Sequence, residues 1–196
     1  MAIELRNVSI SFGEETLLRN VSLKVGAGEA FILIGPSGYG KSTLLKLMAG
    51  LLEPTTGEVM INGKNLASLR GLERDALLRR MGMLFQKNAL FDSLSVAENV
   101  AFPLREVLGT PDNEIPAIVD RYLKAVGIDH AKDLFPDEIS GGMQKRLGIA
   151  RALVLRPEIV LYDDPTAGLD PITSQKIIQL IKELQTKDGA TIVAVT

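Results

Sequence analysis

Apolar and polar residues follow two different periods along the chain, and these periods predict alternating strands and helices. Residues 1–25 alternate apolar with polar side chains, which predicts two antiparallel strands joined by a turn at SFGEET, residues 11–16. The continuous apolar run EAFILIG, residues 29–35, predicts a strand buried on both faces. In the next segment, residues 41–52, apolar side chains recur at helical spacing.

The centre of the chain carries one further strand signal, followed by helix signals. Residues 53–64, EPTTGEVMINGK, predict a further strand and turn. Ser95 and Glu98 have the spacing of a capping box and predict a helix start. Helical spacing over residues 110–130 predicts a helix that ends at Gly127. We therefore expect a helical subdomain at approximately residues 88–155.

Strand and helix signals alternate again near the C-terminus. PEIVLY, residues 157–162, predicts a buried strand, and ATIVAV, residues 190–195, predicts another. Between them the pattern predicts a helix with Asp170 as N-cap, Pro171 at its first position and Gly189 as its stop. Strands that alternate with helices indicate an α/β fold with a mostly parallel sheet. The N-terminal strands add an antiparallel β subdomain.

Composition limits the function classes. A chain of 196 residues suits one domain, and 22 basic against 24 acidic residues give a net charge of −2 without bulk attraction to nucleic acid. Cysteine is absent and His130 is the single histidine, which excludes thiolate and His-rich zinc sites. No apolar run reaches the roughly 20 residues of a membrane span, and the N-terminus lacks a secretion signal pattern. We expect a soluble, cytoplasmic chain without a nucleic-acid partner.

The most specific chemical motif is GPSGYGKST, residues 35–43, which matches the phosphate-binding P-loop pattern between a predicted strand and a predicted helix. Glycines let backbone N–H groups point at phosphate oxygens, and the helix N-terminus adds its positive dipole end. Lys41 is expected to contact the β and γ phosphates and Ser42 a magnesium ion. The expected nucleotide-binding residues of this loop are Gly35, Pro36, Ser37, Gly38, Tyr39, Gly40, Lys41, Ser42 and Thr43.

Two adjacent acids follow the predicted strand at residues 157–162. In P-loop proteins an acid at the end of a neighbouring buried strand fixes Mg²⁺, and Asp163 has this position. The alternative is an ordinary solvated acid at a strand end. Asp164 comes next, either as a second catalytic carboxylate or without a chemical role.

A third motif, EISGGMQKRLGIARAL at residues 138–153, lies between the other two. Ser140, Gly141 and Gly142 offer a hydroxyl and backbone donors to a phosphate, although an N-cap serine with a glycine turn explains them equally well. The order of the three motifs resembles that of ATP-binding-cassette (ABC) ATPases, whose signature usually reads LSGGQ. Ile139 and Met143 depart from that pattern.

The resemblance covers the whole chain and implies roles for further residues. Phe12 resembles the aromatic residue that stacks on adenine, with a core position as the alternative. Gln86 resembles the Q-loop glutamine, which contacts Mg²⁺ and the attacking water. Asp170, in AGLD, resembles the D-loop aspartate that contacts the opposite subunit. The family architecture implies a P-loop NTPase core, ATP and Mg²⁺ as cofactors, and a head-to-tail dimer of two copies.

Two departures from the family bear on hydrolysis. The general base is usually Glu, and Asp164 is one methylene shorter, which retracts the carboxylate by roughly 1.5 Å. The switch histidine that normally follows the strand TIVAVT is absent, and His130 lies too early to replace it. We therefore expect residues 1–196 to be a single, C-terminally truncated nucleotide-binding domain with weak turnover.

Motif spacing and two sequence stretches indicate a branch of the family. Lys41 and Ser140 lie 99 positions apart, which leaves no room for long coiled coils and favours a transporter subunit. Residues 90–106 and 162–174 look most like the Mla or Mce-associated (toluene-tolerance) lipid-transport ATPases. Alternatives are the ATPases of lipoprotein release, methionine uptake or amino-acid uptake, and a regulatory module with little hydrolysis.

The transporter interpretation implies partners and a location. A transmembrane permease is expected to dock after the Q-loop, with a substrate-binding protein as an indirect partner. The subunit would lie on the inner face of the bacterial cell membrane. Four apolar residues either line the docking groove or belong to the core: Leu90, Phe91, Phe102 and Leu104.

Overall fold

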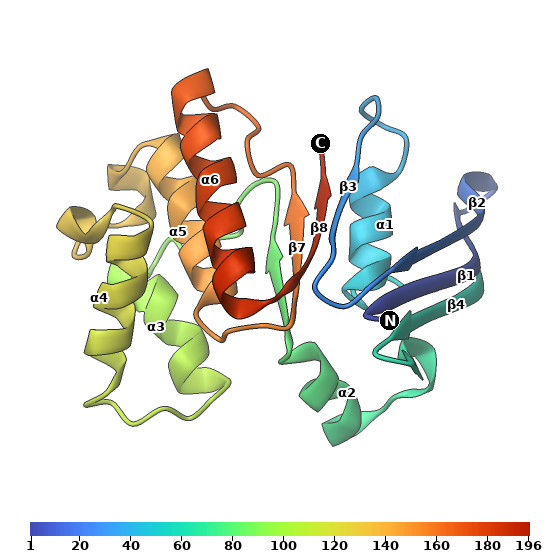
Figure 1. Cartoon of the computed structure of the whole chain (residues 1–196), viewed down its shortest axis with the longest axis horizontal. Coiled ribbons are helices and arrows are strands. Elements are labelled where there is room, and N and C mark those ends of the chain that lie inside the picture. Colours follow the sequence, from blue (N-terminus) through green and yellow to red (C-terminus); the bar gives the residue numbers. More distant parts are fainter. The chain divides into compact units, whose positions relative to one another are not determined.

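The chain forms two compact units, shown as a ribbon in Figure 1. The computed structural model describes the backbone of residues 1–196 and every side chain except those at positions 180, 184, 185, 187 and 188. The first unit contains Met1–Met83, Glu158–Asp163 and Gly189–Thr196. The second contains Leu84–Pro157 and Asp164–Asp188.

An antiparallel sheet in the first unit is formed by the alternating N-terminal segments, as predicted. Its strands follow the order β2 (Glu15–Val25), β1 (Ile3–Phe12), β4 (Thr56–Ile61) and β5 (Lys64–Asn65). Four apolar side chains of β1 are buried: Ile3, Leu5, Val8 and Ile10. Burial shifts from odd to even positions between Leu5 and Val8, because the register shifts there and Asn7 adopts a positive φ of 49°.

Gly57 lies in β4 opposite this bulge, between the paired positions Arg6–Glu58 and Ser9–Thr56. Its φ is 87°, and a Cβ there would overlap the carbonyl oxygens of the facing strand. Only glycine therefore allows β4 to approach the bulge so closely.

A second sheet has the order β3 (Ala30–Leu33), β8 (Thr191–Val195), β7 (Ile159–Asp163) and β6 (Met81–Leu84). β8 runs parallel to β3 and to β7. Every residue of β7 is buried, as its apolar run predicted. The prediction that the strand at residues 29–35 is buried on both faces is wrong, because β3 is an edge strand and Ile32 is 60% exposed.

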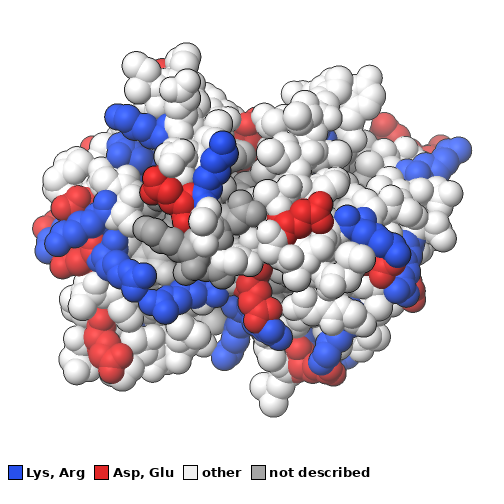
Figure 2. Space-filling model, viewed as in Figure 1, with Lys and Arg blue, Asp and Glu red and all other residues white. Residues whose placement is uncertain are grey.

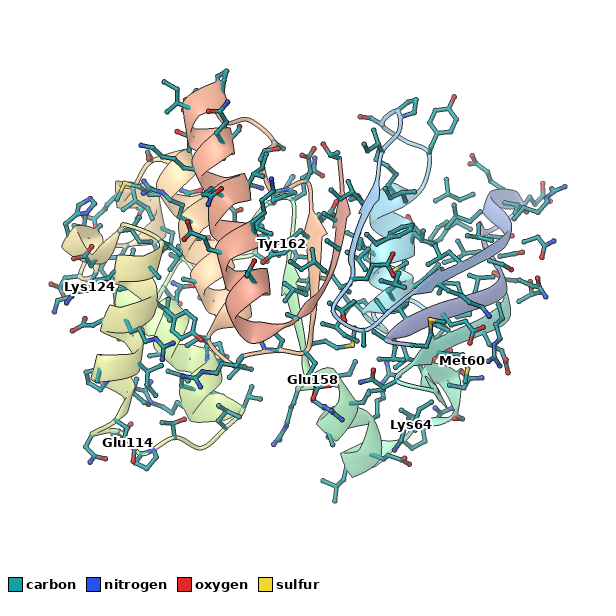
Figure 3. The ribbon with its side chains drawn as sticks, viewed as in Figure 1. Met60, Lys64, Glu114, Lys124, Glu158 and Tyr162 are labelled. Carbon is teal, nitrogen blue, oxygen red and sulfur yellow. The ribbon has the colours of Figure 1, made fainter. Side chains whose placement is uncertain are left out.

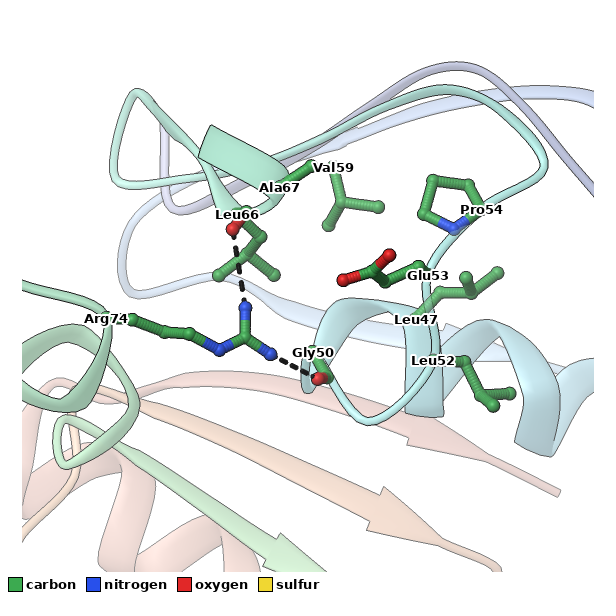
Figure 4. A pocket seen from close by; sticks show the side chains of 9 residues that line it. All are labelled: Leu47, Gly50, Leu52, Glu53, Pro54, Val59, Leu66, Ala67 and Arg74. Atoms are coloured by element: carbon green, nitrogen blue, oxygen red, sulfur yellow. Dashed lines mark hydrogen bonds between the residues drawn. The ribbon is translucent and has the colours of Figure 1, made fainter. Parts of the chain in front are cut away.

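Helix α1 (Lys41–Met48) packs on β7, β8 and β4, with Leu45 and Leu47 fully buried. Ala49 is its C-cap, and Gly50 follows with a φ of 68°, which suits the left-handed residue after a helix. Arg74 of α2 (Gly71–Leu78) donates hydrogen bonds to the carbonyl oxygens of Gly50 at 2.7 Å and Leu66 at 3.3 Å, as Figure 4 shows. The guanidinium thus ties the C-terminal end of α1 to α2 and to the η1 turn (Leu66–Ser68).

The segments that lead into β6 and β7 are also tied together. Glu158, labelled in Figure 3, precedes β7, and its backbone N–H donates to the carbonyl oxygen of Arg80 at 2.8 Å. The two side chains form an ion pair. These contacts set the start of β7 and so fix where that strand ends, at Asp163.

The second unit is helical. Its α-helices are α3 (Val96–Glu106), α4 (Ile115–Ala125), α5 (Gly141–Leu153) and α6 (Pro171–Asp188). The capping box that opens α3 at Ser95 is confirmed, with Ser95 and Glu98 each accepting the other's backbone N–H. Helix α3 packs against both α4 and α5. The short turns η2 (Asp129–Ala131) and η3 (Pro136–Glu138) complete the unit.

The predicted α/β fold class is confirmed. The parallel pairs of the second sheet, the antiparallel N-terminal sheet and the helical segment all occur where the apolar periods indicated. Helix α4 occupies the centre of the predicted 110–130 segment, and Gly127 after it has a φ of 67°.

Candidate nucleotide-binding site

The glycine-rich loop connects β3 to α1, which is the strand–loop–helix context expected of a P-loop. Gly38 and Gly40 have φ angles of 87° and 83°, a conformation that other residues adopt with strain. A Cβ on Gly40 would also lie 2.8 Å from Cδ2 of Leu18. Gly40 is the N-cap of α1 and supplies no capping side chain, so the first N–H groups of the helix remain available to an anion.

Lys41 folds back over the loop. Its Nζ donates to the carbonyl oxygen of Gly35 at 2.6 Å and to that of Pro36 at 2.8 Å. An ammonium has three N–H donors, so one remains for a phosphate oxygen after these two described contacts. Lys41 therefore both shapes the loop and places a positive charge inside its curve.

Ser42 and Asp163 meet although 121 positions separate them. The Ser42 hydroxyl donates to Oδ1 of Asp163 at 2.7 Å. Asp163 is the last residue of β7 and is 4% exposed, which excludes the solvated-acid alternative. These oxygen donors suit Mg²⁺, which is usually bound by one or two carboxylates together with phosphate oxygens and water. Among the described residues no cluster of three or more His, Cys, Asp or Glu could hold a metal alone, so a nucleotide would have to complete this site.

The residue before Asp163 is also unusual. Tyr162, labelled in Figure 3, is fully buried, and its hydroxyl has no hydrogen-bond partner among the described residues. Burial raises the pKa of this phenol, so the side chain stays neutral. Tyr162 therefore acts as a packing residue of β7 and supplies no charge beside the metal-binding acid.

Asp164 follows Asp163 directly in the chain and is the first residue of the second segment of the second unit, Asp164–Asp188. It is half-buried and has a φ of 45°, a left-handed conformation in which Asp occurs more often than most residues. Its carbonyl oxygen accepts a hydrogen bond from the N–H of Ala167 at 3.2 Å. The backbone thus turns sharply between the two acids.

Phe12 lies at the end of β1 and is 54% exposed. The ring is therefore not part of the core, which was the alternative to a stacking role. An exposed aromatic face beside a strand end is available for a planar ligand.

Gln86 follows β6, and its side chain is exposed. The backbone carbonyl of Gln86 accepts a hydrogen bond at 2.9 Å from Nζ of Lys145, a residue of α5 that is only 3% exposed. A buried ammonium is costly unless it is hydrogen-bonded, so this contact strongly favours the observed position of the Gln86 backbone.

Asn88 and Ala89, further along the same segment, are held by a second cation of α5. Asn88 and Ala89 have positive φ angles of 61° and 50°. Arg151 donates to the carbonyl oxygen of Asn88 at 2.8 Å and to that of Ala89 at 2.7 Å, and burial lowers its pKa. Lys145 and Arg151 therefore clamp the backbone of residues 86–89 onto α5.

The signature residues open that same helix. Ser140 is the N-cap of α5, and its hydroxyl oxygen accepts the N–H of Met143 at 3.3 Å, so the capping alternative is present in the structure. A Cβ on Gly141 would meet nothing within 4 Å, and one on Gly142 would only make ordinary contact with Thr173 at 3.5 Å. The packing of the described chain does not require either glycine.

Asp170 is the N-cap of α6, as predicted. Its Oδ1 accepts the backbone N–H groups of Ile172 and Thr173, both at 3.0 Å. The hydrogen bonds from Thr173, followed by the weaker one from Ile172, lower the pKa of this carboxyl. Asp170 is exposed and ionised, so the carboxylate that caps α6 also remains open to a partner.

The predicted docking residues separate into two classes. Leu104 is 2% exposed and belongs to the core, whereas Leu90 is half-buried. Phe91 and Phe102 are 40% and 36% exposed, and their ring centroids lie 4.6 Å apart. The guanidinium of Arg151 lies 5.5 Å from the centroid of Phe91. We call Phe91 and Phe102 the aromatic patch.

Sequence reasoning missed Lys145 and Arg151, although the sequence carried a signal for Lys145. Lys145, Ile149 and Leu153 are spaced four residues apart on α5, and the two apolar residues are buried. Helical periodicity therefore places Lys145 on the buried face, where a cation needs a partner. His130 is exposed in η2.

Charge and hydropathy add two observations. On the face shown in Figure 2, basic and acidic side chains are interspersed rather than gathered into one broad field. In the described part of the chain, no helix combines the length and the apolar character needed to cross a membrane.

Comparisons with known proteins extend these observations. The chain is 50% identical over 193 residues to protein TRIGALACTOSYLDIACYLGLYCEROL 3, chloroplastic, of Arabidopsis thaliana, covering 95% of this chain and 56% of that protein. It is 43% identical to the intermembrane phospholipid transport system ATP-binding protein MlaF of Haemophilus influenzae, covering 93% and 69%. It is also 43% identical to the probable ribonucleotide transport ATP-binding protein mkl of Mycobacterium leprae, covering 100% and 56%. The chain thus spans little more than half the length of two of these relatives.

A solved structure and a family match agree with these similarities to ATP-binding proteins. The ATP-binding cassette MJ0796, determined as a dimer in a post-hydrolysis state bound to ADP and Pi, aligns with a TM-score of 0.91 and 38% identity, covering 99% of this chain and 87% of that one. Residues 18–167 match the family described as ABC transporter, so the resemblance inferred from the P-loop and signature motifs is confirmed. The chain belongs to the ABC transporter family, as an ATP-binding cassette.

Proposed function

We propose that the chain is the ATP-binding and ATP-hydrolysing subunit of an ABC transporter that moves phospholipids between membranes. The observation that carries the ATPase proposal is the hydrogen bond between Ser42 and Asp163, which brings the two expected Mg²⁺ ligands together beside the P-loop. The lipid substrate is supported by the similarity to proteins named for intermembrane phospholipid transport.

Most of the nucleotide-binding residues that we assign belong to the first unit, whereas Gln86 belongs to the second. Phe12 stacks on the adenine, residues 35–43 surround the phosphates, and Lys41 donates to them. Mg²⁺, held by Ser42, Asp163 and Gln86, would neutralise charge on the phosphate oxygens. The family match and the nucleotide-bound relative support ATP as the ligand.

Hydrolysis is assigned to Asp164 and Gln86. Asp164 acts as general base and takes a proton from the attacking water, and Gln86 orients that water. Both residues belong to the second unit, and the backbone of Gln86 is fixed by Lys145. The short aspartate makes this step slow, because a displacement of about 1 Å can cost about a hundredfold in rate.

Two copies form a head-to-tail dimer, in which Ser140, Gly141, Gly142 and Asp170 of one copy contact the nucleotide site of the other. The relative determined as a dimer supports dimerisation. A permease docks on the aromatic patch, which the clamp from α5 links to the Q-loop segment. The subunit thereby lies peripherally on the inner face of the bacterial cell membrane, with a substrate-binding protein as an indirect partner.

Single-turnover ATP hydrolysis with Asp164→Asn tests the enzymatic proposal. The substitution keeps the size of the side chain and removes its charge, so turnover should fall at least about a hundredfold while ATP binding persists. Asp129→Asn, at an exposed acid in η2, is the matched control and should leave turnover unchanged. Equal turnover of the native and Asp164→Asn proteins would show that Asp164 is not the base.

The short side chain and left-handed backbone of Asp164 favour one second candidate, a nucleotide-gated regulatory module with little hydrolysis. In that case ATP would still drive dimerisation, but single-turnover hydrolysis would stay near the background rate in the native protein. Affinity purification from membranes separates the substrate alternatives. A lipid-transport permease should be recovered, and recovery of a lipoprotein-release, methionine or amino-acid permease would contradict the lipid assignment.

A further inference from the structure

The second unit contains a groove with a volume of about 300 Å³, and no residue of its described lining is assigned to nucleotide chemistry. It lies where the C-terminal end of α3, the middle of α4 and the end of α5 come together. Leu104, Tyr122 and Val154 line it and are 2%, 8% and 3% exposed. Leu108 also lines it and is 56% exposed. The lining is therefore apolar where it is buried, and Leu108 extends the apolar surface toward solvent.

Two cations lie among the residues of this lining. Arg121 and Arg156 are both exposed, and neither forms an ion pair with a described residue. None of the described residues that line the groove is acidic. The Arg121 guanidinium lies 5.9 Å from the ring centroid of Tyr122, which places it beside an apolar wall. The groove thus combines apolar surface with positive charge that the described chain does not neutralise.

Arg156 is held in a strained backbone conformation. Its φ is 49°, a left-handed value that is unfavourable for a residue other than Gly, Asn or Asp. Pro157 follows and restricts the same residue further. Asn or Gly would make this turn more easily, so the turn itself does not explain the arginine. Such outliers, where the residue type works against the backbone, are typical of functional sites.

We propose that this groove binds the acyl chain of a monomeric fatty acid, with its carboxylate paired to Arg121 and Arg156. The volume lies at the lower end of the range for small-molecule sites, which suits one chain rather than a diacyl lipid. A fully polar metabolite would leave the apolar lining unmatched. A protein helix is the competing occupant, and a groove of this size would take only a few of its side chains. The site goes beyond the proposed function, because it needs neither nucleotide nor permease.

Isothermal titration calorimetry of the whole chain without nucleotide tests the proposal, with octanoate and decanoate below their micelle concentrations. Each additional CH₂ should tighten binding about fourfold at most while the groove still has room, and longer chains should gain nothing. Decanol, which has the same chain without the charge, should bind at least about tenfold more weakly. Equal affinities for decanoate and decanol would overturn the proposal, and so would an affinity that does not depend on chain length.

Variants of the two arginines locate the site. Arg121→Gln and Arg156→Gln should each weaken decanoate binding about tenfold, and Arg156→Lys should retain most of it. Arg156→Asn relieves the backbone strain and removes the charge, so it should raise Tm while weakening binding. Arg79→Gln, at an exposed arginine in the first unit, is the control and should bind as the native chain does. Unchanged decanoate binding by Arg121→Gln and Arg156→Gln would place the fatty acid elsewhere. If the groove bound a peptide instead, and both variants bound that peptide as tightly as the native chain does, the assignment would likewise be refuted.

Discussion

Gly141 offers a direct test of why the signature motif contains glycine. It is the first residue of α5 after the N-cap, its φ is not positive, and a Cβ there would meet nothing within 4 Å. The chain itself therefore has room for alanine. If glycine is required for the close approach of a nucleotide held by another copy, Gly141→Ala should raise the stability of the chain and weaken its ATP-dependent dimerisation.

The expected stability change follows from backbone entropy. Gly→Ala at a position whose backbone angles suit alanine stabilises a protein by about 0.4–1 kcal/mol. For a chain of this length that gain corresponds to an increase in Tm of about 1–4 °C. A methyl group between the helix N-terminus and a phosphate should weaken nucleotide-dependent dimerisation at least about tenfold, since it obstructs the backbone N–H donors.

Gly148, seven residues further along the same helix, provides the matched control. A Cβ there would lie 2.7 Å from Cδ1 of Leu84, which is 1% exposed and has little space to move. Overpacking costs about 1–3 kcal/mol, so Gly148→Ala should lower the free energy of unfolding by about 1 kcal/mol or more. The two substitutions add the same methyl group to the same helix and should change stability in opposite directions.

Differential scanning calorimetry measures the stability changes, and analytical ultracentrifugation with ATP and Asp164→Asn as background measures dimerisation. A Gly141→Ala protein that dimerises normally would refute the reasoning, because the glycine would then have no intermolecular role. A Gly141→Ala protein with a lower Tm would show that the space found around Gly141 is not available.

Three further predictions concern the first unit. Gly57→Ala should lower the free energy of unfolding by about 3 kcal/mol in urea titrations, through left-handed strain and overlap with the facing carbonyls; a loss below about 1 kcal/mol would contradict the bulge geometry. Hydrogen bonds from Arg6 and then Lys24 lower the pKa of Glu4 from 4.5 to about 2, so the stability that Glu4 contributes should be complete above about pH 4.5 and disappear as the pH falls toward 2. A pH-independent difference between the native and Glu4→Gln proteins would contradict this. Tyr162→Phe should leave the free energy of unfolding unchanged or raise it by about 1 kcal/mol, because the buried hydroxyl lacks a described partner; a loss of more than about 1 kcal/mol would mean that it has one.

The sequence predicted most of the elements because their periods are local. Helix α3 shows this clearly, since its start needed only the spacing of Ser95 and Glu98, and the structure contains both hydrogen bonds of that capping box. The apolar run of β7 was likewise sufficient to place Asp163 at the end of a buried strand. The exposure of β3 could not be predicted in this way, because an apolar run does not reveal whether a strand has neighbours on both sides.

In the site, too, local motifs could be predicted from the sequence and contacts between distant segments could not. The P-loop motif identified Lys41 and Ser42, since its residues are contiguous, and the family pattern identified Asp163. The contacts of Lys145 and Arg151 with residues 86–89 depend on two segments about sixty positions apart, and no local period encodes such a pairing. The bulge at Asn7 was also missed, although the apolar positions change from odd, at Ile3 and Leu5, to even, at Val8 and Ile10.

Helix α1 has only eight residues, and a helix this short is marginal without support at its ends. Arg74 anchors its C-terminal end through the carbonyl oxygen of Gly50, whereas no side chain caps the N-terminal end. The free energy of local opening is therefore unequal along the helix. Without nucleotide, amide hydrogens near Ser42 should exchange with solvent sooner than those near Met48, and a bound phosphate would act as the missing cap and even out their protection.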